Sequence, residues 1–264
     1  MRILITNDDG ITAPGLAVAE EIAAEIAGPE GEVWVVAPDF ERSGVSHAIS
    51  YTTPTRLTEI EPRRFSVDGF PADCALVGLQ SVLRESPPDL VISGVNRGHN
   101  VAEDVVYSGT VGGALEAALN GARAIALSQF YARDPEAPED LFEPARALGA
   151  EAVRHVIAMP WEPFLFYNVN FPARRAEVVE GMTVCPHGLR AESTFELVPF
   201  TAPNGRVYQF YAHRTANASA EPGTDARALI DGWITITPLR PQMTDAAALE
   251  SARRVLAERV AGAG

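Results

Sequence analysis

The sequence predicts an α/β fold in which helices cover both faces of a parallel sheet. Short, almost continuously apolar segments recur along the first two thirds of the chain, and segments with apolar residues at helical spacing separate them. Glycine or proline marks most of the boundaries. Continuous apolar runs are typical of strands that are buried on both faces. Their alternation with helices indicates βαβ units joined by right-handed crossovers.

The individual elements follow from this pattern. The apolar segments that predict strands are residues 2–6, 33–37, 90–92, 124–127 and 164–169. A helix is expected to begin at Pro14, because Val18, Ile22 and Ile26 recur at four-residue spacing before Gly28. Further helices are predicted to begin at Pro71 and to span residues 110–119, 141–158 and 246–260.

The character of the sequence changes at about residue 177. Gly, Pro, Asn and Thr interrupt short β-like runs at residues 207–211 and 233–237. We therefore divide the chain into a core, residues 1–175, and residues 176–264, which are expected to form a β-hairpin arm, a returning strand and a C-terminal helix of the same structural domain. Interrupted segments suit a buried parallel sheet poorly, so the arm is expected to pair with a second subunit.

The composition limits the partners and the compartment. Lys and Arg number 21 and Asp and Glu number 35, a net charge of −14 that disfavours nucleic-acid polymers and anionic membranes. Cys74 and Cys185 show no CxxC spacing, which argues against a disulfide scaffold or a thiolate zinc site. No leader peptide and no apolar stretch of about 20 residues is evident, so we expect a cytoplasmic protein.

Three polar segments follow the first three predicted strands. They are residues 7–10, 39–46 and 93–100. Open parallel sheets bind ligands at the carboxyl ends of their strands, so these segments are expected to converge at one edge.

The adjacent carboxylates of Asp8 and Asp9 indicate a bound cation. Two such charges about 4 Å apart repel by about 4 kcal/mol at an effective dielectric constant of 20. Ser43 can add a hydroxyl and Asn96 an amide oxygen, and this all-oxygen set suits Mg²⁺, Mn²⁺ or Ca²⁺. Taken alone, the Asp-Asp-Gly run is also typical of a turn and helix cap.

An anion site is expected where Ser108, Gly109 and Thr110 open a helix, because backbone N–H groups are free there. The chain contains neither a Walker loop nor a GxGxxG segment after its first strand. Other side chains in the three polar segments could meet phosphate or move protons, with surface exposure as the alternative; they are His47, His99, Arg42 and Arg97.

Together these motifs resemble the stationary-phase survival protein SurE family of 5′-nucleotidases. The resemblance is specific over residues 1–128 and returns at 222–239. The motifs that carry it are RILITNDDGI at 2–11, APD at 37–39 with RSG at 42–44, SGVN at 93–96 with Gly98 and Asn100, YSGT at 107–110, PGTD at 222–225 and ITPL at 236–239. Phe40 and Phe70 depart from the family pattern, and the first departure puts the substrate preference in question.

The resemblance implies a Rossmann-like core and one divalent cation per subunit, Mg²⁺ or Mn²⁺, with Ca²⁺ possible in crystals. Its metal ligands correspond to Asp8, Asp9, Ser43 and Asn96, the same set that the residues indicate. It also implies hydrolysis of nucleoside 5′- and 3′-monophosphates, and in some members of short polyphosphate. Family members form homodimers or tetramers through extended β arms and an exchanged C-terminal segment.

The mechanism expected from these residues is attack of water on a phosphate held beside the metal. Asp8 or Asp9 would accept the proton of the water, with Asn96 as the third catalytic residue. Side chains and N–H groups expected to bind the phosphate belong to Ser43, Asn96, Asn100, Ser108, Gly109 and Thr110. A phosphatase with a phospho-aspartate intermediate and a regulatory nucleotide- or metal-binding protein without turnover are the alternatives.

Overall fold

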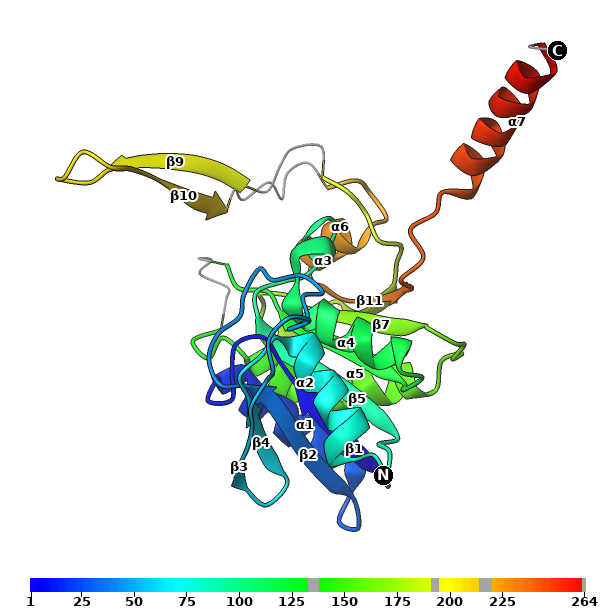
Figure 1. Cartoon of the computed structure of the whole chain (residues 1–264). Helices are drawn as coiled ribbons and strands as arrows, with labels where there is room; N and C mark the ends of the chain where they lie inside the picture. Colours follow the sequence, from blue (N-terminus) through cyan, green and yellow to red (C-terminus); the bar gives the residue numbers. More distant parts are fainter. Residues whose placement is uncertain (133–137, 191–194, 214–219, 263–264) are drawn as a thin grey trace.

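A computed structural model describes residues 1–132, 138–190, 195–213 and 220–262. Within them a nine-stranded sheet forms the centre of the molecule (Figure 1). Its strands, in spatial order, are β3 (Leu57–Glu61), β4 (Arg64–Val67), β2 (Glu32–Pro38), β1 (Arg2–Thr6), β5 (Leu90–Arg97), β6 (Ala124–Gln129), β7 (Phe166–Phe171), β11 (Trp233–Leu239) and β8 (Gly181–Val184).

The six strands from β4 to β7 run parallel, as the alternation of strands and helices predicts. Two helices, α1 (Pro14–Ala27) and α5 (Glu143–Ile157), pack on one face of the sheet, and α2 (Pro71–Val77) and α4 (Gly109–Leu119) pack on the other. Side chains of β1 alternate between the two layers. Ile3 and Ile5 pack with the core on the α1 side, and Leu4 packs with the core on the α4 side. The predicted α/β fold with a largely parallel sheet is confirmed.

The structure contains elements that the sequence pattern did not predict. The hairpin β3–β4 extends the sheet at the edge beyond β2, and β3 is exposed along its whole length, so it lacks the apolar run that marks the central strands. Short helices α3 (Asp104–Tyr107) and α6 (Asp225–Ile230) and a 3-10 turn (Ala176–Val178) also appear. The helix that begins at Pro71 continues beyond α2 as a π-helical segment, Gly78–Val82.

The expectation that the interrupted β-like segments after residue 177 suit the sheet poorly is wrong for residues 233–237, which lie in β11. β11 pairs antiparallel with β7, and β8 pairs parallel with β11. Four consecutive side chains of β11, from Ile234 to Thr237, are buried, so this strand is covered on both faces. It enters the sheet because it runs antiparallel along the free edge of β7, a geometry that needs no crossover helix.

Strand β5 also differs from the prediction. It was expected to end at Ser93-Gly94, but it continues to Arg97 across a register shift between Ser93 and Asn96 relative to β6. Gly94 has φ of +134°, and a Cβ atom there would lie 2.2 Å from the carbonyl oxygen of Leu127. Only glycine fits this irregularity, which bends the strand and redirects the side chains that follow it.

Two segments extend away from the core (Figure 1). Strands β9 (Phe195–Thr201) and β10 (Val207–His213) form a separate antiparallel hairpin, and α7 (Ala246–Gly262) lies at the opposite end of the molecule. The residues of β9 and those of α7 up to Val260 are exposed in the single chain. None of the helices that the structure describes has the length and apolar character needed to cross a membrane.

Candidate active site

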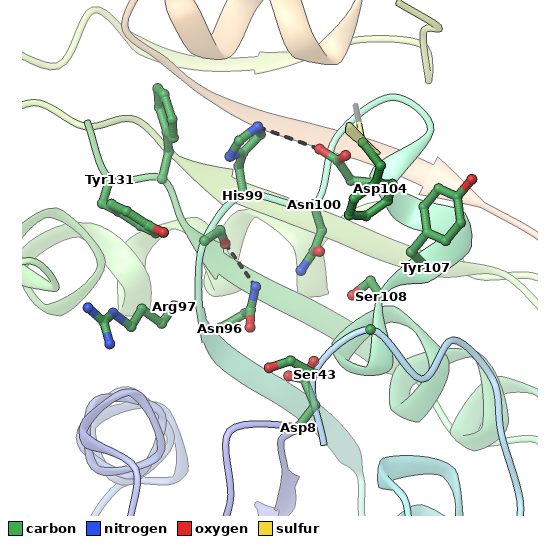
Figure 2. Close-up of a pocket in the computed structure, with 14 residues that line it drawn as sticks. Asp8, Ser43, Asn96, Arg97, His99, Asn100, Asp104, Tyr107, Ser108 and Tyr131 are labelled. Atoms are coloured by element: carbon green, nitrogen blue, oxygen red, sulfur yellow. Dashed lines mark hydrogen bonds and ion pairs between the residues drawn. The ribbon is translucent and has the colours of Figure 1, made fainter. Parts of the chain in front are cut away.

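The three polar segments converge at the carboxyl ends of β1, β2 and β5, as expected. They surround a cavity of about 400 Å³ (Figure 2). Side chains from the loop after β6 and from the hairpin β9–β10 also line this cavity. The lining residues are Asp8, Ser43, Gly44, Asn96, Arg97, Gly98, His99, Asn100, Asp104, Tyr107, Ser108, Phe130, Tyr131 and Phe195.

Asp8 lies at the bottom of this cavity and is 4% exposed. The hydroxyl of Thr110 donates a hydrogen bond to Asp8 Oδ1 at 2.5 Å, and the backbone N–H of Arg42 donates to the Asp8 carbonyl at 2.7 Å. Burial raises the pKa of Asp8 from 3.8 to about 7, and the neighbouring charge of Asp9 adds to the increase, whereas the Thr110 bond opposes it. Among the described residues, no cationic side chain offsets the cost of burying an ionised Asp8.

The side chain of Asp9 takes a different direction. Its Oδ2 accepts a hydrogen bond of 3.0 Å from the backbone N–H of Arg97, and it does not line the cavity. Burial raises the pKa of Asp9, and the charge of Glu41 acts in the same sense, while the Arg97 bond lowers it. The two adjacent carboxylates thus have separate partners, and Asp9 joins the end of β1 to the end of β5.

Ser43 and Asn96 lie near Asp8 at the same end of the cavity (Figure 2). The Ser43 hydroxyl donates to the carboxylate of Glu41 at 2.9 Å. The amide nitrogen of Asn96 donates to the Gly98 carbonyl at 3.0 Å, so its amide oxygen is turned toward Ser43 and Asp8. The nearby donors are oxygens, and the described residues contain no group of three or more His, Cys, Asp and Glu side chains suited to a metal. This set, with a buried carboxylate that needs a counter-charge, fits a hard divalent cation and suits zinc poorly.

The residues predicted to bind phosphate separate into two groups. Ser108 lines the cavity and caps α4, because its hydroxyl oxygen accepts a 3.0 Å hydrogen bond from the Val111 N–H. Thr110 is fully buried, and its hydroxyl holds Asp8 instead of facing the cavity. Gly109 lies behind Asp8, where a Cβ atom would come within 2.9 Å of Asp8 Cβ. Glycine at this position lets the start of α4 approach the carboxylate.

Asn100 lines the cavity and is held by a buried amide network. Its backbone N–H donates to Asn170 Oδ1 at 2.7 Å, and its carbonyl accepts from the side-chain amides of Asn168 at 2.7 Å and Asn170 at 3.2 Å. Its own amide nitrogen donates to the Ser128 hydroxyl at 2.8 Å. The asparagines of β7 therefore fix the loop that follows β5. Two asparagines inside an apolar strand are a sequence signal that could have indicated such a role.

Of the four additional polar candidates, two lie at the cavity and two do not. His99 and Arg97 line it. His47 pairs with Glu116 at 2.6 Å on the side of α4. The guanidinium of Arg42 lies 3.8 Å from the centre of the Phe40 ring and pairs with Asp68 at 3.3 Å.

A buried ionic cluster beside the cavity was not anticipated. The side chain of Arg190 is 1% exposed and contacts Asp104 at 2.9 Å and Glu103 at 3.2 Å. The same guanidinium lies 3.1 Å from Nε2 of His99. Asp225 links two backbone segments, because its carboxylate accepts hydrogen bonds from the N–H groups of Ala102 and Gly188. These partners are far apart in sequence, so local spacing carries no sign of them.

The chain is similar to known proteins over nearly its whole length. A sequence model of the family described as Survival protein SurE matches residues 3–194. A protein of Cereibacter sphaeroides named 5′-nucleotidase SurE is 53% identical over 248 residues, covering 92% of this chain and 95% of that protein. One of Ruegeria pomeroyi with the same name is 49% identical over 260 residues, covering 97% and 100%. The crystal structure of a SurE protein from Aquifex aeolicus superposes with a TM-score of 0.81 at 34% identity, covering 97% of this chain and 99% of that one. The chain belongs to the SurE family.

Proposed function

We propose that this protein is a divalent-metal-dependent phosphomonoesterase that hydrolyses nucleoside 5′-monophosphates to nucleoside and phosphate. The observation that carries this proposal is the buried carboxylate of Asp8, which lines the same cavity as the side chains of Ser43 and Asn96. The relatives named 5′-nucleotidase support the reaction, since the identity extends over nearly the whole chain. We extend the proposal to nucleoside 3′-monophosphates and short polyphosphate as further substrates.

The proposed ligands of the cation, one Mg²⁺ or Mn²⁺ per subunit, are Asp8, Asp9, Ser43 and Asn96. When bound, the cation offsets the charge that develops on the phosphate and lowers the pKa of the attacking water. Asp8, held in one orientation by Thr110, or Asp9 accepts the proton of that water.

The remaining groups bind the phosphate. Asn100 and Ser108 line the same cavity as Asp8, which supports their proposed role as hydrogen-bond donors to the phosphate oxygens. The N–H groups at the start of α4, near Gly109 and Thr110, give this side of the cavity a positive potential. The amide network behind Asn100 holds that side chain in place and limits reorganisation during the reaction.

A phosphate-release assay tests the proposal. Purified protein, freed of metal by EDTA, should release no phosphate from a panel of nucleoside 5′- and 3′-monophosphates, and Mn²⁺ or Mg²⁺ should restore release. Full activity in excess EDTA would exclude the proposed site. Binding of nucleotide without any turnover would instead indicate a regulatory binding protein, and a trapped phospho-enzyme that borohydride reduces would indicate a phospho-aspartate route.

We further propose that the protein is a homodimer or tetramer of the cytoplasm. The hairpin β9–β10 bears exposed apolar side chains, among them Leu197, Phe200, Phe210 and Tyr211. Such a surface is typical of an interface. The free cysteines, Cys74 and Cys185, suit a reducing compartment. A monomeric mass by light scattering at micromolar concentration, or recovery outside the cytoplasmic fraction, would contradict these two statements.

A further inference from the structure

The cavity has two chemically different ends. Asp8, Ser43 and Asn96 lie at one end, and aromatic rings lie at the other (Figure 2). The aromatic end is lined by His99, Tyr107, Phe130, Tyr131 and Phe195. If the proposed function places the phosphate at the carboxylate end, the rest of the substrate has to extend toward the rings.

The rings at this end retain much of their exposed surface. Tyr107 is 46% exposed, Tyr131 is 53% exposed and Phe195 is 37% exposed. Apolar rings gathered at the mouth of a concave site are typical of ligand contact, because packing alone would have covered them. Flat π-faces of this kind stack on nucleobases whatever the base, since every base presents a π-face.

Phe195 is the first residue of β9 and connects the hairpin to the cavity. Its ring lies edge-to-face with Tyr107 of α3, with centroids 5.2 Å apart and an interplanar angle of 87°. The chain is anchored nearby, because the Arg190 backbone N–H donates to Glu103 at 3.0 Å and its guanidinium pairs with Asp104 at 2.9 Å. The buried Arg190 is therefore tied to the loop that forms the cavity wall.

We propose that Phe195, together with Tyr107, forms the nucleobase-binding wall of the cavity, so that the root of the hairpin determines substrate specificity in addition to any role in assembly. This inference rests on the proposed function, since it assigns the part of the substrate that the carboxylate end does not bind. Stacking selects nucleotides over phosphate esters that lack a base, and it distinguishes poorly among the bases.

The test compares Phe195→Ala with wild type on ligands that differ only in the base. Loss of one stacking ring should raise the KM for a nucleoside 5′-monophosphate about tenfold and leave the inhibition constant of ribose 5-phosphate unchanged. The kcat should stay within about twofold, because Phe195 does not contact the reacting atoms. Phe195→Tyr retains a ring and should restore the wild-type KM.

Phe210→Ala is the matched control, because Phe210 belongs to the same hairpin, is 59% exposed and does not line the cavity. Phe210→Ala should leave the nucleotide KM and the inhibition constant of ribose 5-phosphate unchanged. Light scattering shows whether Phe195→Ala or Phe210→Ala alters assembly. An unchanged nucleotide KM in Phe195→Ala, or an equal loss for ribose 5-phosphate, would overturn the inference. Failure of the wild type to release phosphate would count against the proposed function instead, and nucleotide binding by calorimetry would then still decide whether Phe195 contacts the base.

Discussion

Asp8→Asn separates the proposed role of this residue as a metal ligand from its effect on folding. The substitution removes the negative charge and keeps a side-chain oxygen that can accept the hydrogen bond from Thr110. In the metal-free protein the wild-type carboxylate is buried with its pKa raised to about 7. An acid whose pKa is higher in the folded state than in the unfolded state binds more protons when folded, so its ionisation destabilises the fold as the pH rises.

The size of the effect follows from the same pKa. The difference between 3.8 and about 7 corresponds to a destabilisation of about 4 kcal/mol once the pH exceeds the folded value, at about 1.4 kcal/mol per pKa unit. At about pH 5.5 roughly 2 kcal/mol of this penalty is present. Asp8→Asn should therefore stabilise the metal-free protein, and this stabilisation should be larger above the folded pKa of Asp8 than at about pH 5.5.

Urea unfolding in EDTA, at about pH 5.5 and about pH 8, measures the difference in the free energy of unfolding between Asp8→Asn and the wild type at each pH. Both conditions lie above the isoelectric point of about 4.8. Adding Mn²⁺ should then stabilise the wild type and leave Asp8→Asn unchanged, while phosphate release by the variant is lost. A pH-independent difference, or an Asp8→Asn variant with normal turnover, would refute the reasoning about burial and ligation.

Three further substitutions address other parts of the site. Asn96→Ala should lose metal affinity and phosphate release without any gain in metal-free stability, because no charge is removed; calorimetric titration with Mn²⁺ and thermal melts test this. Gly109→Ala places a methyl group within 3.0 Å of Asp8 Oδ2, so activity and melting temperature should both fall, whereas a normal rate would show that α4 can move aside. Arg190→Met removes the buried guanidinium that pairs with Glu103 and Asp104 and should cost about 3–5 kcal/mol in chemical unfolding. Its control is Arg227→Met, which removes an exposed pair with Asp231 and should change stability little.

The central part of the fold was predictable from the sequence because its signals are local. Residues 2–6 form β1 as predicted, and the predicted helix at Pro14 ends before Gly28. Burial on both faces leaves continuous apolar runs in the sequence, and proline and glycine mark the ends of the helices. Strand β3 carries no comparable signal, because all five of its residues are exposed.

The same distinction applies to the site. Asp8, Ser43, Asn96, Asn100 and Ser108 meet at one cavity because the carboxyl ends of parallel strands share an edge. The sequence did not reveal that the hydroxyl of Thr110 faces Asp8, since this depends on the way α4 is packed.

The aromatic end and the ionic cluster were not predictable either. Arg190 pairs with residues that precede it by more than 80 positions, and Phe195 reaches the cavity from the hairpin. Such contacts are created by the fold and leave no periodicity in the sequence.

Arg190 and Asp225, which come late in the chain, bind the loop after β5. These contacts can form only after most of the chain has been translated. The ribosome releases the N-terminal residues first, so Asp8, Ser43 and Asn96 emerge early. At that stage β7 has no β11 beside it, Asp104 has no Arg190 and Ala102 has no Asp225. A nascent chain halted after residue 175 therefore carries all the proposed metal ligands on an open-edged sheet with an unsupported cavity wall. The contacts that complete this wall and cover the edge of β7 can form only after residues up to 239 have left the ribosome.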